Sequence, residues 1–316
     1  MWLKTFKLQL SWVGLGLIVL TTQALARPIE LTVGFYFPPY QFSKAQFQYT
    51  QTLLAPEIEL VPFYASPSSQ QSVLVTGYDN TYHLVTHVEN AHLLQAVVLG
   101  VNQKQGEKLE LLRCQHKQSC QSWVYINENS SYQRLRLLAK NAFADYKLVT
   151  ATKNKKFIKQ LELEWPELHI VTTEDSNIKT FELVKKASVL GDIFVLLPDD
   201  DLNDAATGRV TLQYLFQQKV ITMGFSSGSY NAGAMIASYA DYPNMLLTAK
   251  LKLLSPTTTE QTVFLSACYQ DYYMNEPLMS RIYGEQLNNV VNSDTLYLLA
   301  DELNYQCFKK HKENTD

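Results

Sequence analysis

The chain has 316 residues, of which 27 are Lys or Arg and 30 are Asp or Glu, so its formal net charge at pH 7 is −3. A mildly acidic chain without basic clusters argues against a nucleic-acid partner and against docking on an anionic membrane surface. The length is large for one hydrophobic core and natural for two lobes of ordinary domain size.

Residues 1–26 have the pattern of a secretory signal peptide. Two lysines precede an uncharged apolar run over 10–20, and Ala24-Leu25-Ala26 gives the small-x-small pattern that a signal peptidase recognises. The run is shorter than the roughly 20 residues that span a bilayer, although an uncleaved anchor is the alternative. We therefore predict a periplasmic mature chain that starts at Arg27, with 25 basic and 30 acidic residues and a net charge of −5.

Beyond residue 70, short apolar runs alternate with stretches of helical spacing. Strands are predicted at 73–76, 94–101, 123–126, 146–150, 168–172, 192–197, 220–223 and 262–267. Helices are predicted at 82–91, 132–143, 153–163, 176–189, 204–218, 277–288 and 294–306. Apolar runs separated by helices are typical of βαβ units in a parallel sheet that is covered on both faces.

These units are too numerous for one sheet of ordinary size. We therefore predict an α/β protein with two doubly wound parallel-sheet lobes and a ligand cleft between them. Lobe one is expected over 27–127 plus roughly 230–258, and lobe two over 128–229 plus roughly 259–316. Two segments fit less well, because residues 41–72 show no clean period and 255–261 (SPTTTEQ) has the composition of a linker.

Four cysteines follow the predicted signal peptide, and an even number in an exported chain indicates disulfides. Three pairings are possible. We favour Cys114–Cys120, which closes a small loop, together with Cys268–Cys307, which ties down the C-terminal tail. Buried thiols are the alternative, and the spacing does not match a CxxC redox or zinc motif.

The second half of the chain carries a family resemblance. An apolar strand ends in Pro-Asp at 194–199, a strand leads to a Gly-Phe-Ser turn at 220–226, Tyr-x-Ala-Gly-Ala follows at 230–234, and a strand meets an Asn-led helix at 274–279. Over about 190–285 the chain thus resembles the ABC-transporter substrate-binding proteins of the periplasmic-binding type I-like fold, the group with tryptophan- and tyrosine-type binders. Residues 34–40 (GFYFPPY) look more like the opening of the type II fold used for amino acids. Both resemblances imply a binding protein, and they differ on the fold of the first lobe.

The resemblance implies two lobes that trap a ligand between them. In open parallel sheets, ligands lie beyond the carboxyl ends of the strands, and hinge closure buries them. The candidate ligand contacts are therefore residues at or just after predicted strand ends, with one residue near a crossing between the lobes: Thr76, Gly77, Tyr78, Asn127, Asp199, Ser226 and Tyr230.

Each candidate has an expected role and a structural alternative. Thr76 and Ser226 offer hydroxyls, and the Gly77 backbone can approach a carboxylate or simply permit a tight turn. Asp199 can take an ammonium group, or it can cap the following helix. The two tyrosines can stack on an aromatic ligand, or they can be ordinary partly buried rings.

Residues 224–228 match G-x-S-x-G, the nucleophile elbow of α/β-hydrolases, with Ser226 in the nucleophile position. That fold needs an acid and then a His later in the chain. The later His is His311, five residues from the end, where a base would lack packed support. We therefore do not expect an enzyme.

Metal and cofactor motifs are incomplete. His83 and His87 are four apart, but the Glu of H-E-x-x-H is missing, and His92 lies off their helical face. The acidic run that starts at Asp199 has Val210 where an EF-hand loop has its Glu. No glycine-rich phosphate loop is present. We expect no metal and no cofactor.

The leading functional prediction is a monomeric periplasmic solute-binding protein that captures a small molecule, such as an amino acid, for an ABC importer. The main competing function is that of a ligand-sensing partner of a membrane receptor or signalling protein. Two functions that the sequence favours less are an α/β-hydrolase-like esterase and a scaffold that no longer binds a ligand.

Overall fold

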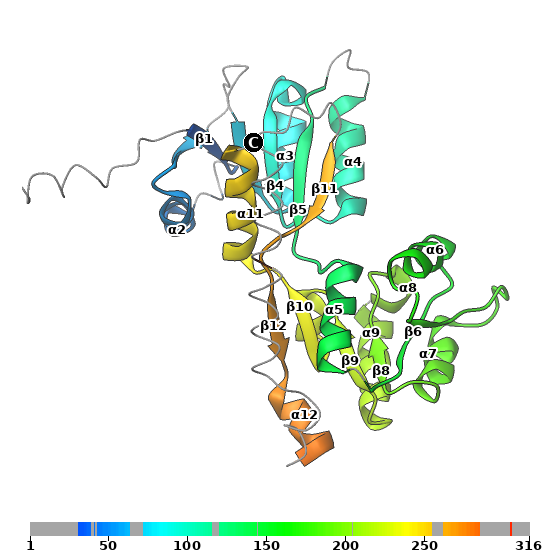
Figure 1. Cartoon of the computed structure of the whole chain (residues 1–316). Coiled ribbons are helices and arrows are strands. Elements are labelled where there is room, and N and C mark those ends of the chain that lie inside the picture. The colour runs from blue at the N-terminus through cyan, green and yellow to red at the C-terminus, as the bar shows by residue number, and fades with distance from the viewer. Residues whose placement is uncertain are drawn as a thin grey trace, which may run out of the picture.

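The computed structural model describes residues 31–38, 41, 43–63, 72–115, 120–143, 145–203, 205–254, 262–284 and 304. Within them the chain forms two lobes, each built on a six-stranded sheet covered by helices (Figure 1). The predicted fold class is therefore confirmed. The signal peptide, the linker at 255–261 and Cys307 lie outside the described residues. No helix in the described part combines the length and the apolar character that a membrane crossing requires.

The first sheet is entirely parallel. Its strands lie in the order β11 (Val263–Ser266), β5 (Trp123–Asn127), β4 (Gln95–Leu99), β3 (Ser72–Thr76), β1 (Leu31–Tyr36), β2 (Ile58–Phe63). The longer helices of this lobe are α2 (Lys44–Leu54), α3 (Tyr78–His87), α4 (Gln103–Cys114) and α11 (Tyr242–Leu254). One turn of 3₁₀ helix, η2 (Ala91–Leu93), precedes β4.

Alternation along the strands explains why both faces of this sheet are covered. In β3, Leu74 packs into the cluster that contains Leu246 of α11, while Val73 packs into the cluster that contains Leu84 of α3. Successive side chains of a strand point to opposite faces, so an all-apolar strand needs helices on both. Each of these leucines is fully buried, which stabilises the fold by roughly 1.5–3 kcal/mol per side chain.

The second sheet is parallel except at one edge, where β12 runs antiparallel to β10. Its strands lie in the order β12 (Asp271–Met274), β10 (Ile236–Tyr239), β9 (Ile221–Gly224), β8 (Ile193–Val195), β6 (Leu148–Ala151), β7 (His169–Val171). In the described part of this lobe the helices are α5 (Tyr132–Ala142), α6 (Lys155–Glu164), α7 (Thr180–Ser188), α8 (Asp200–Asn203), α9 (Ala205–Gln217), α10 (Ser227–Asn231) and α12 (Glu276–Tyr283).

The two sheets share one strand order. Numbered within each lobe, the first five strands lie as 2-1-3-4-5, an order known from doubly wound nucleotide-binding folds. Residues 31–36 form β1, which lies between β2 and β3 in that order. The first lobe therefore repeats the topology of the second, and the resemblance of residues 34–40 to a different fold does not extend to the strand order.

The predicted lobe boundaries in the second half of the chain need correction. Residues 236–239 were expected in lobe one, but they form β10 in the second sheet. Residues 263–266 were expected in lobe two, but they form β11 beside β5 in the first sheet. Both segments are short and apolar, and which sheet each joins depends on hydrogen bonds to distant strands.

Among the described residues, three segments connect the lobes: 128–131, 240–241 and 267–270. They lie side by side, because Ala240 N donates to Glu128 O (2.9 Å) and Ala267 N donates to Asn127 O (3.1 Å). The lobes are thus joined by a narrow bundle of neighbouring segments, which is the geometry of a hinge.

A buried glutamine ties these connecting segments together. Gln270 is 1% exposed, and its Oε1 lies 2.5 Å from Ser130 Oγ and 3.4 Å from Ser238 Oγ. Its Nε2 donates to Ala267 O (2.9 Å) and to Asn129 O (3.3 Å). The Gln270 side chain therefore contacts segments 128–131 and 267–270, and also β10, which leads into segment 240–241.

Two further groups fasten the backbone at Gln270. Arg134 of α5 donates from Nη2 to Gln270 O (2.7 Å), and burial lowers the pKa of this arginine. Gln270 N donates to Asn304 Oδ1 (3.1 Å), so residue 304 also contacts the hinge. Nearby Cys268 is disulfide-bonded.

Candidate functional site

A cleft of about 1680 Å³ lies between the two lobes. Its first wall follows the carboxyl ends of β4, β5 and β11 with Gly100, Asn127 and Ser266, and its opposite wall follows β8 and β9 with Asp199 and Ser226. The first connecting segment, 128–131, runs along the cleft between them. Strand ends of both sheets thus face one cavity, as expected for a ligand site of two doubly wound lobes.

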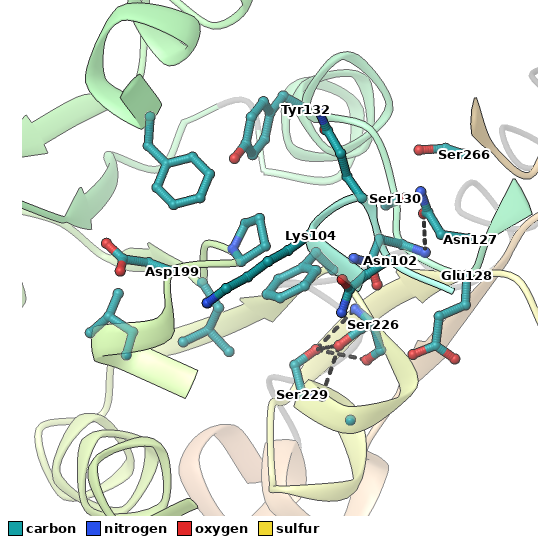
Figure 2. Close-up of a pocket in the computed structure, with 18 of the residues that line it drawn as sticks. Asn102, Lys104, Asn127, Glu128, Ser130, Tyr132, Asp199, Ser226, Ser229 and Ser266 are labelled. Carbon is teal, nitrogen blue, oxygen red and sulfur yellow. Dashed lines mark hydrogen bonds between the residues drawn. The ribbon is translucent and has the colours of Figure 1, made fainter. Parts of the chain in front are cut away.

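The lobe-one wall depends on the turn between β4 and α4. Gly100 has φ +71°, a conformation that favours glycine, so the chain can reverse direction directly after β4. Asn102 then caps α4, accepting from Gln105 N (2.9 Å), while Gln105 Oε1 accepts from Asn102 N (3.2 Å). This capping box fixes the start of α4, which places Lys104 on the cleft (Figure 2).

The lobe-two wall holds a buried carboxylate. Asp199 is 4% exposed and directly precedes α8. Its Oδ1 accepts from Asp201 N (3.1 Å), and its second oxygen accepts a hydrogen bond from the buried Thr152 hydroxyl. The helix-capping role is therefore present, and the same carboxylate also lines the cleft.

Tyr132 lines the cleft from the first turn of α5. Burial raises the pKa of its hydroxyl, and the negative charges of Glu164 and Asp199 raise it further. Figure 2 shows the ring standing across the pocket from Ser226 and Ser229. This part of the cleft therefore combines an aromatic surface with two nearby carboxylates.

Ser226 caps α10 and does not have the surroundings of a nucleophile. Its Oγ accepts from Ser229 N (3.1 Å), and its own N donates to Ser229 Oγ (3.1 Å), which forms a capping box. No histidine is among the described residues that line the cleft. A nucleophilic serine is activated by an adjacent general base, whereas Ser226 contacts Ser229 of the helix cap.

Three of the seven predicted contacts line the cleft: Asn127, Asp199 and Ser226. Asn127 marks the first crossing, where its Oδ1 accepts from Asn129 N (2.9 Å). The structure thus brings these three residues to one cavity, and their contact with a ligand remains a prediction.

The remaining four do not line the cleft. Thr76 ends β3, and Gly77 and Tyr78 follow it, one strand further from the second lobe than β4. There Thr76 O accepts from Asn80 Nδ2 (2.9 Å), and Tyr78 stacks on Tyr82 with ring centres 6.2 Å apart. The turn that lines the cleft is therefore the turn after β4, and not the turn after β3 as predicted.

Tyr230 also lies outside the wall. Its ring packs near those of Tyr239 (6.3 Å) and Tyr273 (5.7 Å), which are themselves stacked at 4.1 Å. Its neighbours Asn231 and Ala232 line the cleft instead. A one-residue step on a helix turns a side chain by about 100°, so a motif can be in place while its tyrosine faces elsewhere.

Sequence reasoning missed Asn102, Lys104 and Tyr132 as wall residues. Asn102 and Gln105 match the capping-box spacing after a predicted strand, a signal that was present in the sequence. For Lys104 and Tyr132, exposure to the cleft depends on how the lobes face each other.

The histidine cluster does not form a metal site. Across the described ranges, no group of three or more His, Cys, Asp or Glu side chains is placed to hold a metal ion. The rings of His83 and His87 stack at 4.1 Å, and His83 Nδ1 lies 2.6 Å from the Tyr36 hydroxyl. His92 lies in η2, beyond the end of α3, so the predicted helix over 82–91 ends earlier than expected.

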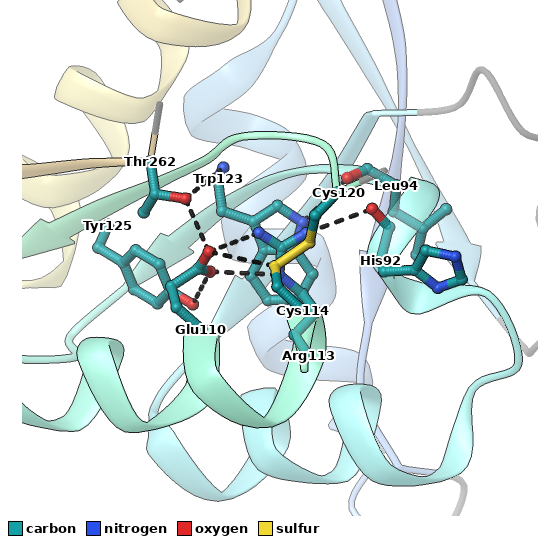
Figure 3. A network of polar contacts seen from close by, with 9 residues as sticks. All are labelled: His92, Leu94, Glu110, Arg113, Cys114, Cys120, Trp123, Tyr125 and Thr262. Atoms are coloured by element: carbon teal, nitrogen blue, oxygen red, sulfur yellow. Dashed lines mark hydrogen bonds and ion pairs between the residues drawn. A yellow bond between two sulfur atoms is a disulfide. The ribbon is translucent and has the colours of Figure 1, made fainter. Parts of the chain in front are cut away.

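A second polar cluster lies outside the cleft, between α4 and the start of β5 (Figure 3). Glu110 accepts from Arg113 Nη2 (2.6 Å), the Tyr125 hydroxyl (2.8 Å) and Thr262 Oγ1 (2.7 Å). Arg113 is 3% exposed and lies 4.3 Å above the centre of the Trp123 ring. The charges are paired with each other and the cluster has no opening onto the cleft, so it is a structural feature.

The predicted Cys114–Cys120 disulfide beside this cluster is confirmed, with its Cα atoms 5.7 Å apart. Replacing both cysteines with Ser is expected to lower the free energy of unfolding by about 2 kcal/mol, because the unfolded chain regains loop freedom. Chemical unfolding of the oxidised wild type and of the double variant, both without reductant, measures the loss. Equal stability of the oxidised wild type and the double variant would contradict the prediction.

No protein-family model and no curated protein matches the chain. Among solved structures, it is similar to a conserved domain protein from Vibrio cholerae (16% identity, TM-score 0.45, covering 84% of this chain and 97% of that one). It is also similar to an ABC domain in complex with L-Trp from Streptococcus pneumonia (12%, 0.40, 79% and 93%). A third is the ligand-free, open structure of a substrate binding protein with adhesive properties from Clostridium difficile (9%, 0.49, 80% and 94%).

Proposed function

We propose that this chain is an exported, non-enzymatic solute-binding protein that closes its two lobes over a small molecule. The observation that carries the proposal is the cleft itself, because the carboxyl ends of strands from both sheets meet there. Three neighbouring segments form the connection between the lobes, so a small rotation at the hinge changes the width of the cleft. The disulfides support export, since such bonds persist in oxidising compartments.

The polar groups of the two walls suit a small polar or charged ligand. Asn127 and Asn102 offer amide groups, Ser226 offers a hydroxyl, and Asp199 offers a carboxylate. When the lobes close, a ligand with a polar group at each end can form hydrogen bonds with both walls at the same time. An amino acid is one such molecule, and its ammonium group suits Asp199.

Ligand binding is expected to raise the thermal stability and to shrink the molecule. Thermal unfolding is measured in the presence of amino acids, amines and small organic acids. A ligand at a hundred times its Kd raises the free energy of unfolding by about 2.7 kcal/mol. X-ray scattering in solution then measures the radius of gyration, which falls if the lobes close. A screen in which no compound stabilises the protein would favour a scaffold that binds no ligand.

A blocking variant tests whether binding occurs in the cleft. Gly228 lines it, and a Cβ built on Gly228 meets a single neighbouring atom, Ser226 Oγ at 3.7 Å. Gly228→Leu therefore adds bulk to the cleft from a position where the Cβ atom itself has room, and binding is expected to be lost. Asn141→Leu places the same side chain on an exposed position of α5 as the control. Binding that survives in Gly228→Leu would place the ligand elsewhere.

Delivery to an ABC importer is the second half of the proposal. A strain that lacks this chain is expected to take up the labelled ligand more slowly than its parent, with recovery on complementation. Unchanged uptake together with a lost response to the ligand would instead support the sensory function.

A further inference from the structure

The buried charge of the cleft wall is negative. Among the described charged residues that line the cleft, Asp199 is the one that is buried. The cations of the wall are placed differently: Lys104, Lys156 and Arg209 are exposed, and Lys153 donates to Ile178 O (3.1 Å). Exposed cations are screened by water and select weakly for an anion, whereas a buried carboxylate selects strongly for a cation.

Aromatic and aliphatic side chains share this wall with Asp199. Tyr132 and Phe225 are each 7% exposed and Leu196 is 4% exposed, and all three line the cleft. Phe157 adds a half-buried ring. Ring faces attract cations as well as apolar groups, so this surface fits an apolar body and the ammonium group attached to it.

The hydroxyl of Tyr132 lies near two carboxylates. Burial is the main cause that raises its pKa, and the negative charges of Glu164 and Asp199 raise it further. The same two negative charges attract a positive group on this side of the cleft.

We propose that the ligand is an organic amine with an apolar, ring-sized body, and that it needs no carboxylate of its own. Its ammonium group pairs with Asp199, and its body packs on Tyr132, Phe225 and Leu196. This inference rests on the proposed function, and it narrows the ligand from a general small molecule to a cation.

Three matched compounds test the charge requirement by calorimetry: phenylalanine, 2-phenylethylamine, which lacks the carboxylate, and 3-phenylpropanoate, which lacks the amine. We expect 2-phenylethylamine to bind at least as tightly as phenylalanine, and 3-phenylpropanoate to bind about tenfold or more weakly than either. Equal or tighter binding of 3-phenylpropanoate would overturn the inference while leaving the solute-binding function in place.

A pair of substitutions locates the charge. Asp199→Asn keeps a helix-capping side chain and removes the charge, so we expect the protein to fold and its affinity for the amine to fall by about tenfold or more. Asp175→Asn removes the same charge from an exposed position that does not line the cleft, and it is expected to change the affinity by less than about threefold. Equal effects of the two substitutions would contradict the assignment to Asp199.

Further results decide between the two proposals. If the three compounds fail but another compound from the wider screen binds, the Asp199→Asn comparison is repeated with that compound. Loss of its binding supports the inference, and unchanged binding overturns it. If no compound of any charge stabilises the protein or alters its radius of gyration, the proposed function fails together with the inference.

Discussion

Glu110→Ala is expected to lower the free energy of unfolding by about 3–5 kcal/mol. Glu110 is the acceptor of the cluster between α4 and β5, and its loss leaves the guanidinium of Arg113 buried without its carboxylate. The hydroxyls of Tyr125 and Thr262 lose their acceptor at the same time. Breaking a buried ion pair by removing one partner costs more than the pair itself contributes, which is why the expected effect is large.

Urea unfolding measures this effect, with Glu107→Ala as the matched control. Glu107 is exposed on the same helix and accepts from Gln103 Nε2 (2.8 Å), so its removal is expected to cost less than about 0.5 kcal/mol. Glu110→Gln keeps an acceptor without the charge and should fall between the two. A difference of less than about 1 kcal/mol between Glu110→Ala and Glu107→Ala would show that the Glu110–Arg113 pair does not stabilise the fold as expected.

Gln270→Ala is expected to destabilise the protein by about 3 kcal/mol and to change how the lobes are held. The substitution leaves the hydroxyls of Ser130 and Ser238 and the carbonyls of Asn129 and Ala267 without the amide that contacts them. Unmade hydrogen bonds in a buried place each carry a desolvation cost, and here they belong to segments that join the lobes.

Two measurements separate the parts of this prediction. Chemical unfolding gives the stability, and X-ray scattering gives the distribution of distances between the lobes, which should broaden. Gln160→Ala is the control, since Gln160 is exposed and donates from Nε2 to Glu164 Oε1 (2.9 Å). A Gln270→Ala protein that is less stable but scatters like the wild type would show that Gln270 supports the core without setting the lobe arrangement.

Most strands could be predicted from the sequence because buried parallel strands are continuous apolar runs. The run at 94–101 became β4 and the run at 220–223 became β9. Residues 41–72 gave no such signal for two reasons. The helix α2 buries few side chains, and β2 is an edge strand that contains Pro62 and alternates buried with exposed positions.

The candidate site was harder to predict than the strands. Asp199 and Ser226 could be identified because each follows a predicted strand end, and in the structure each caps the helix that comes next. Whether β3 or β4 borders the cleft depends on the orientation of the lobes, which is set by contacts such as those of Gln270. Such contacts join residues more than a hundred positions apart, and no local pattern encodes them.

The interleaving of the lobes has a consequence for how the chain is made. The sheet of lobe one begins at residue 31, but its last strand, β11, ends at Ser266, after β6 to β10 of the second lobe have been synthesised. Until α11 has been synthesised, the apolar face formed by Val33, Leu60 and Leu74 lacks one of the helices that pack on it. The lobe that starts first is therefore completed after most of the second, and the unfinished half presents apolar surface to chaperones during that interval.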